Sequence, residues 1–458
     1  MTNLDTITEK SSTPIKLYLR THGFVAAVIQ KMSSSSKKKL FFYTLFIIFC
    51  VILMISRRPG SIFHARFYAE DGQAWYADAY NYSFLSNIFR PDSGFSAFTR
   101  PNSGYLLTFQ RLLAQIDVLF PLRFAPLFFN ICAVAVQTLP LFYILSSRME
   151  VLLPKQWQRV ILCVVYVALP NSFEVSLILT NSNWRLALLA IFIVIARRPV
   201  TKWQIIADIA IFVTTCLTGP FAIFLLPFIF AKYLTERNKY RLSLLMTSVA
   251  CSILQMYFIR NSHTKIFARG VLYAAKEIIY VFTGQVIMGS LIGMHNYSYL
   301  FRGIWFTLPS LRSASLVLGA IIFGWILIKS NFAMRIMILY GTLIMLGGII
   351  SIRPGETTGM ILMIFPGTSV RYEFILIFSL FTGLLWIVFV GKNDIMRMLA
   401  ILLLFVAAFV AVPSDWVFPQ IHGYHFYHYV NIFNKARKGT VVKIPIYPNS
   451  WKMILIKH

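Results

Sequence analysis

Long apolar runs recur from residue 40 to residue 413, and they are the feature that most constrains how this chain folds. A soluble core of this size would need a polar shell around it. Instead, 58% of the residues are apolar or aromatic, only 13% are charged, and the mean hydropathy is +0.69. This composition excludes a water-soluble enzyme and predicts an all-α fold, a polytopic transmembrane helical bundle.

Apolar length and flanking charge predict about eleven spans. The first covers 40–55, and the Arg57, Arg58 and Pro59 that follow it are unlike a small-residue cleavage site, so we interpret it as an uncleaved helix. Spans near Pro170 and Gly219 are shorter than the roughly 20 residues that cross a bilayer upright, which predicts helices that end at membrane depth. The later spans are expected at 122–145, 159–170, 184–196, 203–218, 220–234, 242–258, 313–329, 334–351, 373–390 and 397–413.

The distribution of Lys and Arg predicts the sidedness of the chain. With residues 1–39 in the cytoplasm, every short cytoplasmic turn carries Lys or Arg, as the positive-inside rule requires. Residues 271–294 carry Lys276 and Glu277 near their start, so we expect an interfacial or re-entrant helix; if this stretch crosses, everything after it inverts. The predicted parts are a basic cytoplasmic segment 1–39, a multi-pass domain 40–413 with outer loops 57–121 and 259–312, and an extracytoplasmic segment 414–458.

Charge and cysteine content restrict the partners. The chain has 43 Lys and Arg against 16 Asp and Glu, a net charge of +27. The positive charge is scattered among apolar spans, so we expect anionic membrane lipids and phosphate-bearing lipids as partners and no nucleic acid. All five cysteines lie in apolar runs without a CxxC motif, which excludes a disulfide framework and a thiolate zinc site.

The densest polar cluster follows the first span. Four of the 16 acidic residues lie within 23 positions, and Tyr68 and other aromatic residues are interleaved with them. If 68–80 is helical, Asp71, Trp75 and Asp78 share a face on the membrane surface. A carboxylate held there by Arg could deprotonate an acceptor hydroxyl or hold a divalent cation against a phosphate; the alternative is a solvated loop of local ion pairs. The cluster comprises Arg66, Glu70, Asp71, Trp75, Asp78, Asp92 and Arg100.

A second cluster combines Glu174, Asn181, Asn183, Trp184 and Arg185 between two short spans. Amides match the hydroxyl pattern of a sugar, and an aromatic face packs on the apolar side of a pyranose ring. The alternative is helix capping by Asn with an interfacial Trp and an Arg that reaches toward the membrane surface.

Arg353 and Arg371 bracket a third predicted outer loop. Positive residues on the outer face oppose the positive-inside rule, and a guanidinium fork suits a lipid phosphate or pyrophosphate. The alternative is contact with outer-leaflet headgroups.

His422, His425 and His428 recur every three residues among tyrosines. Steps of three drift around a helix and no cysteine is nearby, so we interpret this segment as an aromatic interfacial belt rather than a metal site. The sequence contains no glycine-rich phosphate loop, GxSxG elbow or HExxH motif, and coupled ATP hydrolysis and serine-type hydrolysis are unsupported.

The order of several short motifs along residues 60–455 resembles poorly characterised bacterial members of the C-type (GT-C) superfamily of polytopic membrane glycosyltransferases. The acidic pair soon after the first helix fits the same resemblance, whereas Glu373 stands where the resemblance leads us to expect an aromatic residue. The motifs are FYAEDG at 67–72, RPNSGY at 100–105, PNSFE at 170–174, NSNW at 181–184, TGPF at 218–221, RYEF at 371–374 and IPIYPNSW at 444–451.

The resemblance implies a glycosyltransferase of the bacterial inner membrane that moves a sugar from a polyprenyl-phosphate-linked donor to an extracytoplasmic glycan or lipid acceptor. In that family an Asp or Glu of the first outer loop is the catalytic base or a metal ligand. Here this would be Asp71 or Glu70, with Asp71 favoured because it shares a face with Trp75. A divalent cation is compatible but not required, and no metal ligand is assigned. The expected substrate-binding residues are Arg66, Trp75, Arg100, Glu174, Asn181, Asn183, Trp184, Arg353 and Arg371.

Three other functions stay open from the sequence. A lipid-linked glycan transporter or flippase would also use a cationic cavity and broken helices, but it would place ionisable residues such as Asp208 at mid-membrane depth. A glycan polymerase of the O-antigen type would carry its catalytic residues in later outer loops. A non-catalytic assembly subunit would tolerate neutralisation of every acid.

Overall fold

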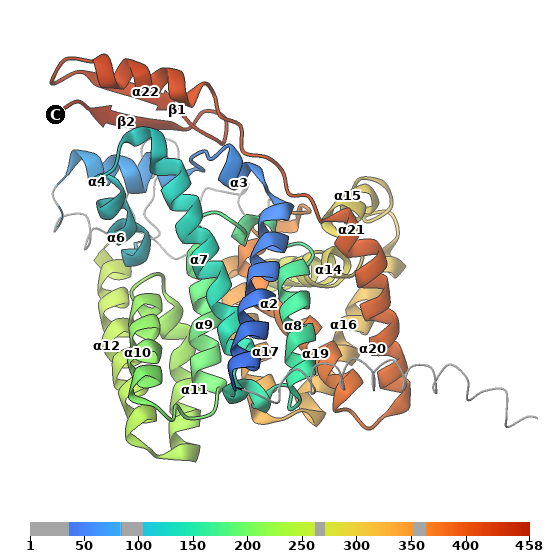
Figure 1. Cartoon of the computed structure of the whole chain (residues 1–458). Coiled ribbons are helices and arrows are strands. Elements are labelled where there is room, and N and C mark those ends of the chain that lie inside the picture. Colours follow the sequence, from blue (N-terminus) through green and yellow to red (C-terminus); the bar gives the residue numbers. More distant parts are fainter. Residues whose placement is uncertain (1–35, 83, 85–103, 262–270, 351–362) are drawn as a thin grey trace, which may run out of the picture.

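The fold is a bundle of helices with a small lobe at one end (Figure 1). A computed structural model describes residues 36–82, 84, 104–261, 271–350 and 363–458. Within these ranges, six helices are long and apolar enough to cross a membrane, so the chain is a multi-pass membrane protein. They are α2 (Ser36–Arg57), η2 with α7 (Leu122–Phe124, Ala125–Leu145), α12 (Lys239–Asn261), α16 (Pro309–Lys329), α17 (Phe332–Ile350), and α20 with η7 and α21 (Asp394–Val406, Ala407–Ala411, Val412–Ser414).

The five remaining apolar segments form shorter helices. They are α8 (Gln156–Ala168), α9 (Ser182–Ile195), α10 (Lys202–Cys216), α11 (Phe221–Glu236) and α19 (Phe374–Phe389). Every apolar run that the sequence marks as a span is therefore helical. Breaks fall where they were predicted, since α8 ends before Pro170, and Gly219, at φ +111°, separates α10 from α11.

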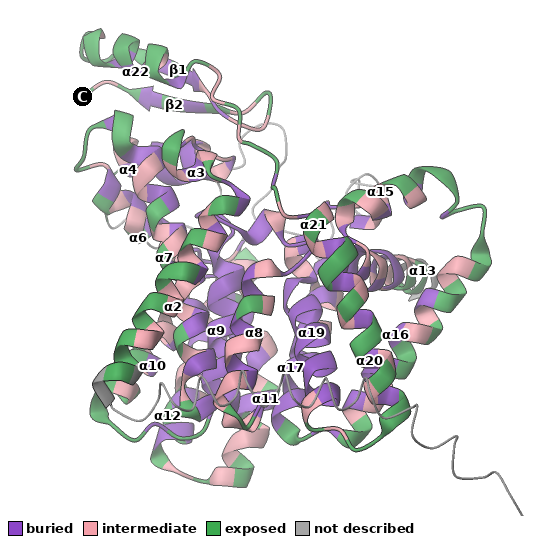
Figure 2. Cartoon of the chain, turned by 45° about the vertical axis from the view of Figure 1, so that its right-hand side comes forward, coloured by how far each residue is buried: buried purple, intermediate pink, exposed green. Residues whose placement is uncertain are grey.

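The short helices α9 and α19 form the centre of the bundle. All residues of α9 are buried, as are all of α19 except Phe389, whereas the long helices expose apolar side chains on their outer faces (Figure 2). A helix that is apolar on every side needs apolar surroundings, and here other helices supply them. Because α9 and α19 are short, the segments before them lie inside the protein at the lobe end of the bundle.

Arg57, the last residue of α2, holds these segments together. The guanidinium of Arg57 donates to the carbonyl oxygens of Val167 (2.7 Å) and Leu169 (3.1 Å), and it lies 4.1 Å from the ring centroid of Phe418. The side chain of Asp415 accepts the backbone N–H of Asn171 at 2.9 Å. The end of α2, the end of α8 and the segment after α21 are thus held together.

The lobe end contains the C-terminal segment and the described residues of 57–121, the segment that the sequence predicts to be outer and that we call the first outer segment. Its described residues form α3 (Gly60–Phe63), η1 (Asp71–Tyr76), α4 (Ala77–Asn81) and α6 (Thr108–Asp117). The C-terminal segment forms α22 (Phe426–Lys435) and an antiparallel hairpin of β1 (Val441–Pro445) and β2 (Lys452–Ile456), in which Val441 pairs with Ile456. Ile444, Met453 and Leu455 share one hydrophobic cluster with Phe67 and Trp75, so the C-terminal lobe packs directly on the first outer segment.

Residues 271–291 form α13 (Val271–Val281), η5 (Phe282–Met288) and α14 (Gly289–Leu291), followed by α15 (Met294–Gly303). The second half of this stretch is buried against α16 and α19, and the Gln285 side chain donates to the carbonyl oxygens of Met363 (3.2 Å) and Thr368 (3.4 Å). In the view of Figure 2, α13 lies in the half of the bundle nearer the lobe. The stretch thus enters the protein, as a re-entrant helix does, and does not lie only on its surface.

Candidate functional site

The acidic pair lies on a short segment that the C-terminal lobe holds in place. Ala69, at φ +45°, donates its backbone N–H to the carbonyl oxygen of Tyr447 at 2.6 Å. The backbone N–H of Asp71 donates to the carbonyl oxygen of Tyr68 at 2.9 Å. A Cβ at position 72 would lie 3.0 Å from Ile446 Cδ1 and 3.2 Å from the Phe67 ring, so Gly72 permits this close packing. The start of η1 is therefore fixed from both sides.

The carboxyl group of Asp71 is buried without a partner. The residue is 1% exposed, and neither carboxylate oxygen has a hydrogen-bond partner among the described residues. Burial raises the pKa of Asp71 well above its usual range and the charge of Glu70 raises it further, while hydrogen-bonding contacts from the backbone at Thr180 and Tyr68, outside good hydrogen-bond geometry, lower it by less. Asp71 is thus a carboxyl group prepared to hold a proton.

Two loops from later in the chain meet beside this pair. They contain η4 (Phe173–Val175) and η6 (Val370–Tyr372). Glu174 accepts the backbone N–H groups of Ser369 (3.1 Å) and Arg371 (3.3 Å), and its Oε2 lies 3.6 Å from Arg371 Nη1. Although burial alone lowers the pKa of the Arg371 guanidinium, the charges of Glu174, Tyr372, Glu70 and Tyr68 raise it above its usual value. Glu70, Glu174 and Arg371 are therefore electrostatic neighbours.

Tyr68 belongs to the same cluster, although the sequence marks it only as one of several interleaved aromatic residues. Burial and the charges of Glu174 and Glu70 raise the pKa of its hydroxyl, while Arg371 and Arg58 act in the opposite direction. Its ring lies 5.8 Å from that of Tyr447. The signal available in the sequence was its position, two residues before Glu70 in the FYAEDG motif.

Arg58 holds the Glu174 loop from the other side. Its guanidinium donates to the carbonyl oxygens of Phe173 (3.2 Å) and Ser176 (3.0 Å), on either side of Glu174. Asn181 Nδ2 donates to the carbonyl oxygen of Glu174 itself at 2.8 Å. These bonds fix the backbone of the loop and leave the carboxylate of Glu174 directed at residues 369–371.

The predicted sugar platform at Trp75 is closed. The side chain is 2% exposed, its indole N–H donates to Thr180 Oγ1 at 2.7 Å, and the Arg111 guanidinium lies 5.0 Å from the ring centroid. Arg111 also pairs with Asp78 at 3.1 Å. In this structure Trp75 supports the backbone beside Asp71 and offers no exposed face.

The second predicted cluster is buried. Asn183 Oδ1 has no partner among the described residues, and the Trp184 ring packs edge-on against Tyr372 with centroids 4.9 Å apart. Asn181 makes no side-chain cap to α9, so helix capping does not explain it. Arg185 does not reach toward the membrane surface: it is 2% exposed, and its guanidinium lies 4.2 Å from the Phe374 ring centroid.

Glu373 is a further buried acid that the sequence left without a role. It is 0% exposed at the start of α19, and both carboxylate oxygens lack a partner among the described residues. The charges of Glu174 and Arg371 act on it. An acid directly before a run of 16 residues without charge was the signal in the sequence.

Arg66 lies apart from these acids. Its guanidinium is 4.7 Å from the Tyr427 ring centroid, and Nη1 donates to the carbonyl oxygen of Ala65 at 2.8 Å. It pairs with no carboxylate in the part of the chain that the structure describes. The remaining predicted binding residues, Arg100 and Arg353, lie outside the described residues, as does Asp92.

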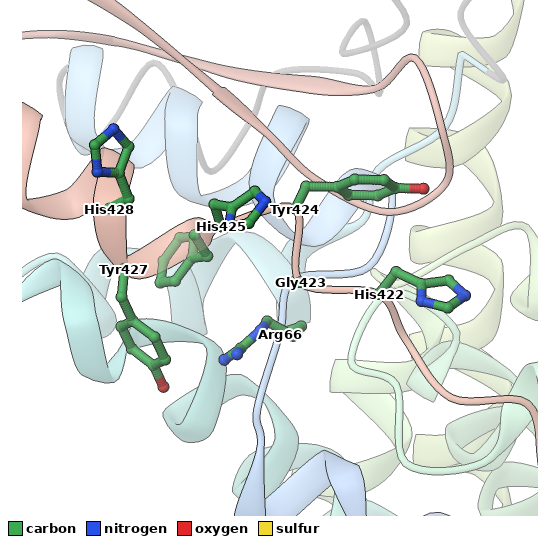
Figure 3. A pocket seen from close by; sticks show the side chains of 8 residues that line it. Arg66, His422, Gly423, Tyr424, His425, Tyr427 and His428 are labelled. Atoms are coloured by element: carbon green, nitrogen blue, oxygen red, sulfur yellow. The ribbon is translucent and has the colours of Figure 1, made fainter.

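Within the described ranges, no three His, Cys, Asp or Glu side chains gather as metal ligands would. His422, His425 and His428 all line a surface hollow with Arg66 (Figure 3). A divalent cation at the acidic pair stays a prediction from the sequence.

The sequence matches no protein-family model and no curated protein. Among solved structures, the chain is similar to the oligosaccharyltransferase of Archaeoglobus fulgidus, crystallised in complex with Zn and sulfate, at 11% identity and a TM-score of 0.37. The match covers 86% of this chain and 56% of the other, so this chain spans little more than half the length of that protein. A likeness at this level carries no argument, and function is inferred from the residues of this chain.

Proposed function

We propose that the protein is a membrane glycosyltransferase that moves a sugar from a polyprenyl-phosphate-linked donor to an extracytoplasmic glycan or lipid acceptor, with Asp71 as general base. The observation that carries the proposal is the buried carboxyl group of Asp71 next to Glu70, whose charge acts both on Asp71 and on Arg371. A buried polar group without a partner costs stability, and such groups with raised pKa values concentrate at active sites.

The raised pKa of Asp71 suits proton removal, because a base is most effective when its pKa approaches the working pH. An acceptor hydroxyl would give its proton to Asp71 while its oxygen forms a bond to the anomeric carbon of the donor. The bond from that carbon to the phosphate oxygen breaks, and the polyprenyl phosphate leaves with the electron pair. Asp71 then passes the proton to water.

Arg371 is the residue best placed to stabilise the leaving phosphate. Its side chain is 34% exposed, its Nη1 lies 3.6 Å from Glu174 Oε2, and its guanidinium lies 5.2 Å from the Tyr372 ring centroid. Its charge lies near Tyr68 and Glu70, the residues that lead into Asp71. A guanidinium suits a phosphate because it donates in a planar fork, and stabilisation of developing charge by fixed donors is a large part of many rate enhancements.

The competing transporter function gains no support from the described residues. Asp208, the ionisable residue that it would use inside a span, accepts both Nη1 (2.9 Å) and Nη2 (2.6 Å) of Arg148 and the Tyr143 hydroxyl (2.6 Å). A carboxylate bound on this many sides is a structural ion pair.

The proposed orientation places the lobe end of the bundle outside the cell. The helix α2 begins at the opposite end, after the basic segment 1–39, and α22, β1 and β2 lie at the lobe end (Figure 1). A reporter fused to the C-terminus should therefore be extracytoplasmic. A cytoplasmic C-terminus would invert the lobe end and contradict an extracytoplasmic acceptor.

The test is the glycolipid and glycan profile of a deletion strain against its parent. We expect a missing or truncated sugar that the wild-type gene restores and Asp71→Asn does not, at equal protein abundance. The matched control is Asp117→Asn, since Asp117 is also a fully buried carboxyl group without a partner but lies outside the cluster; it should restore the profile. An unchanged profile in the deletion strain, or full restoration by Asp71→Asn, would contradict the proposal.

A further inference from the structure

A surface hollow of about 620 Å³ lies beside the candidate site, where the C-terminal lobe meets the first outer segment. It is lined by Arg66 and by residues 422–428, which lead into α22 (Figure 3). Nothing in the proposed chemistry uses these residues.

The backbone around the hollow has an unusual conformation. Tyr424 (φ +39°) and His425 (φ +58°) are consecutive non-glycine residues in the left-handed region, which side chains other than glycine rarely adopt. The carbonyl oxygen of His425 accepts the backbone N–H groups of His428 (2.9 Å) and Tyr429 (3.3 Å) as α22 begins. A Cβ on Gly423 would collide with the Arg66 guanidinium, so the chain passes Arg66 closely only because this position is glycine.

The hollow carries positive charge and no acid. Its lining contains one Arg and three His but neither Asp nor Glu. The C-terminal lobe extends this imbalance, since residues 416–458 hold six Lys and Arg and no Asp or Glu. Arg66 itself contacts an aromatic ring and one carbonyl oxygen, without an ion pair in the described ranges. Its guanidinium fork matches a carboxylate or a phosphate.

Aromatic rings connect the hollow to the acidic pair. The ring of His422 lies 5.9 Å from that of Tyr447, and the ring of Tyr447 lies 5.8 Å from that of Tyr68. Tyr68 is itself an electrostatic neighbour of Glu70 and Arg371. A chain of rings of this kind offers apolar faces on which successive sugar rings can pack between Arg66 and the acids.

We propose that the hollow binds an anionic sugar, a ring that carries a carboxylate or a phosphate, as a subsite for the acceptor glycan. The identification as an acceptor subsite rests on the proposed function, whereas binding of the anionic sugar does not. Arg66 holds the charged group, and the ring of Tyr427, 4.7 Å from the Arg66 guanidinium, lies beside it to support the sugar ring.

The experiment measures equilibrium binding to the full-length protein in phosphatidylcholine nanodiscs. The probes are a glucuronate-containing disaccharide, glucose 6-phosphate, a neutral glucose disaccharide, inorganic phosphate and short-chain phosphatidylglycerol. At least one anionic sugar should bind about tenfold or more tightly than the neutral disaccharide, as expected from one charge-assisted contact. Tighter binding of the glucuronate-containing disaccharide would identify the charged group as a carboxylate, and tighter binding of glucose 6-phosphate would identify it as a phosphate.

Variants locate the site. Arg66→Gln should weaken binding of the anionic sugar by about tenfold. Gly423→Ala keeps the charge but displaces the guanidinium, so it should also weaken binding. Arg437→Gln is the matched control, because it removes the same charge from an exposed position of the same lobe that does not line the hollow, and binding should stay unchanged.

Three results would overturn this subsite: equal binding of neutral and anionic sugars, tightest binding of phosphatidylglycerol or inorganic phosphate, or an unchanged affinity in both Arg66→Gln and Gly423→Ala. None of these measurements requires turnover. A protein that binds the anionic sugar but transfers none retains the subsite and loses the proposed function. A protein that transfers sugar without this binding retains the function and loses the subsite.

Discussion

Asp208 and Asp71 are both 1% exposed, yet their surroundings differ completely. Toward the end of the bundle opposite the C-terminal lobe, Asp208 accepts hydrogen bonds from Arg148, Tyr143 and Tyr240. At the lobe end, the carboxylate oxygens of Asp71 have no partner among the described residues. Burial alone therefore does not separate the two, and the difference is whether the fold supplies partners.

A buried carboxylate with full partners contributes to the fold, because removing one partner leaves the other charge buried and unpaired. A buried carboxyl group without partners destabilises the fold, and its presence asks for a functional reason. Asp117 shows that missing partners are not sufficient: it is equally buried and unpartnered, but burial alone raises its pKa to about 8, without the charge of a neighbouring residue. What distinguishes Asp71 is its position next to Glu70, whose charge acts both on Asp71 and on Arg371.

The largest effect is expected from Asp71→Asn. The amide keeps the size of the side chain but accepts no proton, so the rate of sugar transfer should fall by about 10² to 10⁴. The folded fraction should not fall, because no ion pair of the described residues is lost and the amide oxygen of Asn can accept the same backbone contacts at Thr180 and Tyr68. This rate is measured as single-turnover transfer from a labelled polyprenyl-phosphate sugar, in membranes with equal protein levels. A rate within tenfold of wild type would mean that Asp71, like Asp208, is a structural residue and not the base.

Asp208→Asn should give the opposite phenotype. Loss of the charge leaves the Arg148 guanidinium buried and unpaired, which should cost about 3 to 5 kcal/mol in the free energy of unfolding. Transfer activity per folded molecule should stay unchanged. Thermal and denaturant unfolding in detergent measure the loss. Asp394→Asn, which breaks the exposed pair with Arg397, is the control and should cost less than about 1 kcal/mol. If Asp208→Asn and Asp394→Asn lowered the free energy of unfolding equally, Asp208 would not be the structural ion pair that we contrast with Asp71.

Arg371→Ala should raise the apparent KM for the lipid-linked donor by about tenfold, since it removes one charge-assisted contact to phosphate. Arg371→Lys should raise KM less than Arg371→Ala, because Lys keeps the positive charge but lacks the planar fork of the guanidinium. The control Arg397→Ala changes the same residue type at the opposite end and should leave donor use unchanged. If donor use is unchanged in Arg371→Ala, this arginine contacts lipid headgroups instead, as the alternative from the sequence has it.

The smallest effect on transfer, less than about twofold, is expected from Asp117→Asn, because the residue lies outside the cluster that surrounds the reacting groups. The effect of Asp117→Asn should instead appear in how the free energy of unfolding depends on pH. Because the folded state raises the pKa of Asp117 to about 8, from about 4 in the unfolded chain, folding binds a proton. Its contribution to stability is thus complete below about pH 4 and is lost as the pH rises toward 8. The variant should flatten that decline in unfolding measurements across this range, and a decline of the same slope would contradict the pKa shift.

Much of the fold follows from the sequence, because apolar runs in a membrane have few alternatives to the helix. All eleven apolar segments are helical, and their breaks at Pro170 and Gly219 lie as predicted. The neighbours of Glu70 were harder to predict. Glu174 and Arg371 approach it from positions more than 100 residues away in the chain, and only their polar type marked them as candidates.

The contacts of Arg66 and Trp75 could not be predicted from the sequence. Their proximity to Glu70 and Asp71 in the chain suggested one common surface, but Trp75 is covered and Arg66 faces residues 422–428. Both placements depend on the C-terminal lobe, whose packing on the first outer segment involves residues more than 350 positions away. No periodicity in either segment encodes that contact.

The most direct measurement of the central claim is the pH dependence of sugar transfer, as kcat/KM, by the wild-type protein and by Asp71→Asn. If Asp71 is the base and its pKa is raised by burial, transfer should increase with pH through a midpoint well above the ordinary aspartate value of about 4, because only the ionised carboxylate accepts the proton. The residual activity of Asp71→Asn should lack this rise. The same rise in Asp71→Asn, or a wild-type midpoint near pH 4, would contradict the assignment of Asp71 as the base.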